Sequence, residues 1–251
     1  RGLIGIGSSA AILGVFKIIR MSFKESQFTR MLGISVTIGL LGAMYGGRPV
    51  HFLLNHFGWE SVLNMIAIVG FVLAALIYWI VPEIERQANQ TNIWQDVKSV
   101  LSNPTILMIC ILAGFMVGPL EGFADVWGTE FLKIVYHMDD GSAASLPSLF
   151  YFGMCFGATF LSYMAEKTNA YYGIIILSAV VMGLGFVFIL SGNMSIMGMS
   201  VLFSIIGVLC AYQILSIYKA STYAKSEHVG LATSVANMII MFFGYFFHSA
   251  I

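Results

Sequence analysis

The sequence predicts an all-α, polytopic membrane protein. Hydrophobic residues make up 59% of the 251 residues and charged residues only 10%, whereas roughly a quarter of the residues in soluble domains are charged. The mean hydropathy of +0.88 points the same way. The apolar runs are about 20 residues long, which suits a helix that crosses the hydrocarbon core and is too long for barrel strands.

Composition and motifs exclude several other classes of protein. The formal net charge is zero and no basic stripe appears, which argues against a nucleic-acid partner. The sequence contains neither a Gly-x-Ser-x-Gly nor a His-Glu-x-x-His pattern, so we expect no enzymatic activity. The histidines share no spacing typical of a metal site, and we expect neither a metal nor another cofactor. The cysteines each lie inside an apolar run, where we expect core residues: Cys110, Cys155 and Cys210.

Hydropathy divides the chain into about eight transmembrane helices. The breaks between them fall at polar or helix-breaking clusters, such as His56 to Trp59 and Asp139 to Gly141. The predicted spans are residues 2–21, 31–57, 61–82, 105–136, 146–165, 172–191, 196–218 and 229–251.

The positions of Lys and Arg predict the orientation in the membrane. These residues gather in the connections after residues 21, 82, 165 and 218, while the alternate connections offer only Lys133. Because positive charge marks the cytoplasmic side, we expect those four loops to lie inside the cell.

The longest polar interval, residues 83–103, is the predicted boundary between two helix bundles. Apolar residues repeat at helical spacing from Ile93 to Leu101, which predicts a short amphipathic helix on the inner surface. Asn103-Pro104 is typical of a helix cap followed by the first helical residue. We therefore expect three parts: residues 1–82, a linker at 83–103, and residues 104–251.

The fourth predicted span carries the strongest functional signal. Gly118, Pro119 and Gly122 lie near its middle, where proline removes a helix hydrogen bond and predicts a helix break. Glu121 lies near mid-membrane depth, and Asp125 is one turn further on. Desolvation and mutual repulsion favour a proton on at least one of these carboxyl groups. The arrangement suits proton coupling or solute contact; the alternative is a structural carboxylate paired with Arg or Tyr.

Four other side chains are candidates for a solute pathway. Arg48 lies about 15 Å below the outer end of its predicted helix, where it pairs with a carboxylate, grips an anionic solute, or snorkels outward. Gln213 and Asn237 are candidates for hydrogen bonds to a solute, although bonds between helices are the commoner use of such residues. Trp127 is either an interfacial anchor or a stacking surface.

Several segments resemble the major facilitator superfamily of transporters. Arg1 to Gly7 is similar to its fourth helix, Gly39 to Pro49 to its glycine-rich fifth helix, and Phe57 to Trp59 to the external turn that follows. The resemblance covers essentially the whole chain and implies two six-helix bundles, of which this chain supplies helices 4 to 11 of 12. It also implies that Arg1 stands at the position of a fourth-helix Arg implicated in proton coupling in antiporters.

The nearer resemblance is to a bacterial branch often described as sugar-phosphate-permease-like, which includes phagosomal nutrient transporters. Phe123 to Leu132 resembles its seventh helix, and Gln213 and Asn237 match a Gln of its tenth helix and an Asn of its eleventh. Two departures stand out. Glu166-Lys167 replaces the usual Asp-Arg pair after the eighth helix, which puts that gating contact in doubt, and His248-Ser249 replaces a Gln-Pro pair.

These features predict a monomeric secondary active transporter in a bacterial inner membrane, with a small polar or anionic solute, protons and the lipid bilayer as its partners. It would work by alternating access between the two bundles. Proton symport is the expected coupling, because several carboxylates share one membrane helix and no nucleotide-binding loop is present. The alternatives are a transporter-like sensor or scaffold without transport, and an exchanger that is not coupled to protons. Amino acids, short peptides, nucleosides and organic phosphates are all compatible solutes.

Overall fold

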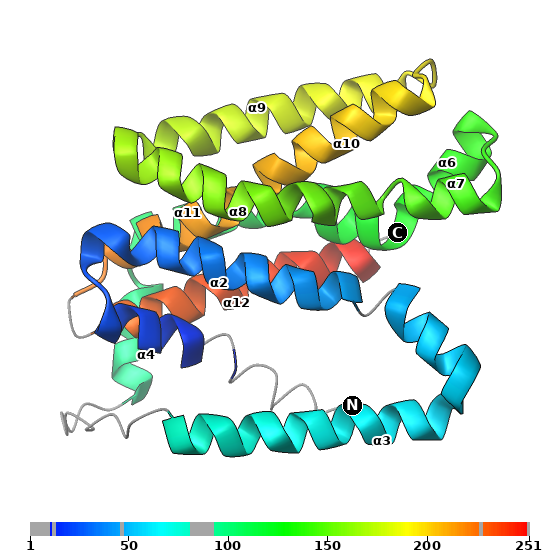
Figure 1. Ribbon diagram of the computed structural model, residues 1–251. Coiled ribbons are helices and arrows are strands. Elements are labelled where there is room, and N and C mark those ends of the chain that lie inside the picture. Colours follow the sequence, from blue (N-terminus) through cyan, green and yellow to red (C-terminus); the bar gives the residue numbers. More distant parts are fainter. Residues whose placement is uncertain (1–10, 12–13, 46–47, 81–92, 226–227, 250–251) are drawn as a thin grey trace. The chain divides into compact units, whose positions relative to one another are not determined.

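The computed structural model describes residues 11, 14–45, 48–80, 93–225 and 228–249 (Figure 1). In these residues the chain is helical apart from short connections and contains no strand, so the predicted all-helical fold is confirmed. The chain divides into two compact units, residues 1–40 together with 93–251, and residues 41–92. The predicted three-part division of the chain stays a prediction.

Six helical stretches in the described residues are long and apolar enough to cross a membrane. They correspond to the last six predicted spans. The first predicted span, 2–21, lies partly outside the described residues, and the second, 31–57, is divided between two helices. The six stretches are His56–Ile80, Pro104–Tyr136, Asp140–Thr168, Tyr171–Leu190, Ile196–Thr222 and Val229–Ser249.

The smaller unit contains the whole of one long helix, α3 (Arg48–Ile80). Gly58 interrupts this helix with φ 74° and ψ 164°, a backbone conformation that glycine adopts without steric cost. The interruption lies inside the predicted break from His56 to Trp59. Helix α2 (Glu25–Tyr45) begins in the larger unit and ends in the smaller one.

The second part of the larger unit, from residue 93 onward, begins with the short helix α4 (Ile93–Leu101), which forms as predicted. It is amphipathic: Val100 is buried and Trp94 is exposed. Helix α5 follows, and the side chain of Asn103 caps it by accepting hydrogen bonds from the backbone N–H groups of Thr105 and Ile106 at 3.0 and 3.4 Å. The predicted cap is therefore confirmed.

Three of the membrane-length stretches are composite. The first joins α5, a π-helical segment η1 and α6; the second joins α7 and α8; the third joins α10 and α11. Helices α9 and α12 are continuous. Their bounds are α5 Pro104–Phe115, η1 Gly118–Trp127, α6 Gly128–Tyr136, α7 Asp140–Ser145, α8 Ser148–Thr168, α9 Tyr171–Leu190, α10 Ile196–Cys210, α11 Tyr212–Thr222 and α12 Val229–Ser249.

Helices α8 and α10 pack backbone against backbone. A Cβ atom added at Gly153 would lie 2.8 Å from the backbone nitrogen of Val208, and one at Gly207 would lie 2.8 Å from Cα of Phe150. A Cβ atom added at Gly157 would likewise lie 2.6 Å from Cα of Val208. Only glycine permits this approach, which is the usual way that membrane helices come close together.

The helix ends that the Lys and Arg pattern assigns to one side lie together. At the predicted inner end, the backbone N–H and Nε of Arg30 in α2 donate to the carboxylate of Glu166 in α8, at 2.7 and 3.0 Å. At the opposite end, the hydroxyl of Tyr136 donates to the carbonyl oxygen of Ile189 at 2.6 Å. Glu166, which the sequence analysis noted as a departure from the resemblance, therefore has a partner in Arg30.

Candidate functional site

The segment η1 places the predicted carboxylates within a membrane-length helix. Pro119 is its second residue, and proline cannot supply the N–H of an α-helical turn. The backbone N–H of Gly128 bonds five residues back, to the carbonyl of Phe123, which is the wider π-helical pattern. The ring of Phe123 anchors the segment in the core, edge-on to Phe186 at 5.3 Å and to Phe203 at 5.8 Å.

Glycines let helix α12 lie close to η1. A Cβ atom at Gly122 would lie 3.3 Å from Cβ of Phe247. A Cβ atom at Gly118 would lie 3.4 Å from Cζ of the Phe247 ring. A Cβ atom at Gly244 of α12 would lie 3.1 Å from Cγ of Glu121. The end of α12 is therefore held against the carboxylates.

Four side chains from three helices form the group that we call the carboxylate cluster: Glu121, Asp125, Tyr151 and His248. Nε2 of His248 lies 3.6 Å from Oε2 of Glu121 and 3.7 Å from Oδ2 of Asp125. The hydroxyl of Tyr151 in α8 donates a hydrogen bond to the carboxylate of Asp125. The Glu121 side chain is 24% exposed and the Asp125 side chain 31% exposed, so the cluster is partly open to the surface.

The cluster can bind and release protons. Carboxyl groups and imidazoles are the side chains that most often carry protons in proteins, and the cluster brings three of them together. The three donor atoms of Glu121, Asp125 and His248 also lie within 4.8 Å of one another, so that these side chains could hold a metal ion as well.

Two members of the cluster were missed in the sequence. His248 carries a usable signal, because it is an ionisable side chain in an otherwise apolar, membrane-length helix, and such residues are often functional. In the sequence its position was noted only as a departure from the resemblance. Tyr151 lies in the aromatic-rich run Phe150 to Phe152 and carries no distinguishing mark. Its role follows only from the contact with Asp125.

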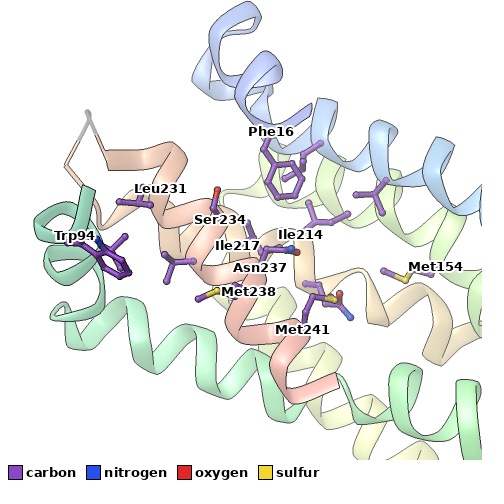
Figure 2. Close-up of a pocket in the computed structure, with 15 residues that line it drawn as sticks. Phe16, Trp94, Met154, Ile214, Ile217, Leu231, Ser234, Asn237, Met238 and Met241 are labelled. Carbon is purple, nitrogen blue, oxygen red and sulfur yellow. The ribbon is translucent and has the colours of Figure 1, made fainter. Parts of the chain in front are cut away.

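A cavity of about 930 Å³ lies elsewhere in the larger unit (Figure 2). Side chains from α2, α4, α8, α11 and α12 line it, among them Leu32, Trp94 and Met154. Gln213 and Asn237, both singled out from the sequence, line the same cavity.

Gln213 is the most enclosed polar side chain of the cavity. It is 6% exposed, and its Nε2 atom has no hydrogen-bond partner among the described residues. Ser234, by contrast, donates its hydroxyl proton to the carbonyl of Gly230 within α12, at 2.9 Å. Asn237 is half-buried on the same face of α12.

The remaining predicted site residues, Trp127, Arg48 and Arg1, are not brought into the cavity or the cluster among the described side chains. Trp127 lies in η1 with its Nε1 atom buried and unpaired in the described part of the chain, and it does not line the cavity. Arg48 is the first residue of α3, and its side chain is not described. Arg1 lies outside the described residues.

The fold and these two sites define the class: a multi-pass integral membrane protein with a cavity and ionisable groups among its helices. A model of the Major Facilitator Superfamily matches residues 1–248. Because the match covers nearly the whole chain, the protein belongs to that superfamily and is a membrane transporter of small solutes. A search of curated proteins found no match.

Proposed function

We propose that the protein is a proton-coupled secondary transporter of the alternating-access type. The observation that carries the proposal is the carboxylate cluster. Two carboxylates and one imidazole meet within 4 Å on membrane helices, where ionisable groups are expensive and mark ion or proton pathways.

The cluster also gives a proton a mechanical effect. With both carboxylates ionised, a protonated His248 is attracted to Glu121 and to Asp125, and it holds the end of α12 against η1. A proton on one carboxylate removes one of these attractions and weakens the link. A proton that binds one arrangement of the helices more tightly than another shifts the population toward the arrangement that it favours. A coupling ion must have such a difference in affinity.

The remaining assignments extend the proposal to the solute and the membrane. Gln213 and Asn237 contact the solute in the cavity, and Trp127, Arg48 and Arg1 contribute to the pathway or to proton coupling. The protein works as a monomer in a bacterial inner membrane, with the loops after residues 21, 82, 165 and 218 in the cytoplasm. Arg30 and Glu166 lie at helix ends that the Lys and Arg pattern assigns to the same side, and their contact supports this orientation.

The test uses the full-length transporter in proteoliposomes that contain a pH-sensitive dye. Wild type is compared with Glu121→Gln, Asp125→Asn and His248→Gln for each class of solute. Glu130→Gln is the matched control, because Glu130 is an exposed carboxylate that pairs with Lys133 at 3.0 Å outside the cluster. We expect solute-dependent acidification of the lumen in wild type and control, and its loss in the Glu121 and Asp125 variants.

Other outcomes point to specific alternatives. Transport of labelled solute without any proton movement would make the protein an exchanger. A folded protein that binds solute and moves none would be a sensor or scaffold. Flux that requires an added divalent cation, and is insensitive to pH, would show that Glu121, Asp125 and His248 hold a metal ion instead.

A further inference from the structure

We propose that the cavity selects uncharged solutes that combine an apolar body with a carbonyl group, and that Gln213 donates a hydrogen bond to that carbonyl. This inference rests on the proposed transport function and narrows its solute. It concerns the cavity of Figure 2 alone.

The first step is the absence of charge. Among the described residues that line the cavity there is no Asp, Glu, Lys, Arg or His. A phosphate or carboxylate in an apolar cavity loses its hydration and needs a cation or several donors in return. The described wall offers no cation, and its side-chain amides are limited to Gln213 and Asn237, so it disfavours organic phosphates and free carboxylates.

The second step is the unpaired amide of Gln213. Nε2 is a donor with no acceptor function, it is buried, and it has no partner in the described part of the chain. A buried polar group without a partner is unfavourable and calls for one. Nε2 has almost no accessible surface, so the Gln213 side chain must turn toward the cavity to reach a solute. A carbonyl oxygen on the solute then satisfies the donor without bringing charge into the cavity. The amide of Asn237 offers a second donor and acceptor on the facing helix.

The third step concerns the rest of the wall. Met154, Met238 and Met241 line the cavity together with aromatic and branched side chains. Methionine is unbranched and polarizable, so it adapts to apolar groups of different shape. The cavity therefore suits an apolar body of variable outline, with one fixed polar contact at Gln213.

The experiment separates binding from transport. The probes are a matched pair of uncharged labelled compounds, one with an amide carbonyl and one with a methylene group in its place, and an organic phosphate of similar size. Their binding to the purified full-length transporter is measured by equilibrium dialysis for wild type, Gln213→Leu and Gln213→Asn. Val97→Ala, also in the wall, is the control for a general change of shape.

We expect the carbonyl probe to bind wild type, and Gln213→Leu to weaken its binding about tenfold, a factor that corresponds to the loss of one hydrogen bond. The methylene probe should lose nothing in the same variant, and Gln213→Asn should recover part of the affinity. Equal losses for both probes, or tighter binding of the phosphate, would overturn the inference.

A second measurement tests whether the cavity is open to solutes at all. Ser234→Cys places a thiol in the wall, while the three native cysteines are buried. In the full-length protein the new thiol should react with a small thiol reagent, and the carbonyl probe should protect it. No reaction would mean that other parts of the protein fill the cavity, which would also overturn the inference. Binding without transport would leave the inference standing and contradict the proposed function.

Discussion

The cavity and the carboxylate cluster have opposite chemistry although two helices, α8 and α12, contribute to both. Helix α8 gives Met154 to the cavity and Tyr151, one turn away, to the cluster. Helix α12 gives Asn237 to the cavity and His248 to the cluster. The described wall of the cavity has no charged residue, whereas the cluster holds two carboxylates and an imidazole. The difference implies that solute choice and proton coupling can be altered separately, while movement of α8 or α12 affects both.

The largest expected effect comes from removing the charges of the cluster alone. In the double variant Glu121→Gln with Asp125→Asn, solute-driven proton flux should fall at least about 100-fold, the lower range for a positioned proton-transfer group. Binding of solute to the cavity should persist. Dye acidification and equilibrium dialysis on the same preparation measure the two quantities. Loss of both in a folded protein would show that the two sites do not act separately.

The reverse change places a charge in the cavity. Gln213→Glu should weaken binding of an uncharged solute about tenfold or more near neutral pH, because it introduces an unpaired carboxylate into an apolar wall. The loss should shrink as the pH falls, since the protonated carboxyl group is uncharged and can donate a hydrogen bond. Binding measured across a pH series checks this. An unchanged affinity at all pH values would place the solute elsewhere.

A change in packing should damage both sites together. Gly157→Ala places a methyl group against the backbone of α10, 2.6 Å from Cα of Val208, and overpacking of this kind costs about 1–3 kcal/mol. Gly183→Ala is the control, because a Cβ atom there meets nothing within 4 Å. Thermal unfolding of the purified protein should show a lower Tm for the first variant only. If Gly157→Ala abolished the function of one site only and left the Tm unchanged, the packing of α8 on α10 would not be what positions both sites.

A smaller effect should follow when the contact between α2 and α8 is broken. Arg30→Gln removes the side-chain hydrogen bond to Glu166 and leaves both sites intact. We expect about a fivefold change in the reactivity of Ser234→Cys toward a membrane-impermeant reagent, at the lower end of typical coupling between two states. Arg30→Lys keeps the charge and should change it less. Equal reactivity in all three proteins would show that this contact does not control access.

The smallest effect lies at a helix cap away from both sites. The backbone N–H of Ser142 donates to Oδ2 of Asp139 at 2.9 Å, and the hydrogen bonds from Ser142 lower the pKa of the Asp139 carboxyl from its ordinary value. Because the folded-state pKa is lowered, the cap contributes its full stability to α7 above the ordinary pKa of an aspartate and loses it as the pH falls through the lowered value. Protection of the Ser142 amide from hydrogen exchange, relative to its intrinsic rate at each pH, should fall only in that acidic range. Asp139→Asn should abolish the pH dependence and leave both sites unchanged.

Local patterns predicted much of this protein. Hydropathy located the membrane-length helices, Asn103-Pro104 located a cap, and charge at membrane depth singled out Glu121 and Asp125. Each of these rests on residues that are neighbours in the sequence. The patterns could not show that His248 reaches the same carboxylates, because that contact depends on how closely two helices approach.

The same limit applies to the cavity and to the contact at the helix ends. Gln213 and Asn237 were selected by resemblance as separate residues, and their meeting in one cavity depends on the rotation of α11 and α12. Glu166 was noted as a departure from the family pattern. Its partner Arg30 lies far away in the sequence, and no periodicity links the two.

The π-helical segment has a consequence for changes in chain length. Its backbone bonds reach five residues back, so it holds one more residue per bonded turn than an α-helix does. Deletion of Gly122 would allow ordinary α-helical turns without shortening the hydrogen-bonded stretch. Glu121 and Asp125 would then stand three residues apart instead of four, which changes the angle between their side chains around the helix axis. The register of this helix is therefore as essential to the cluster as the identity of its residues.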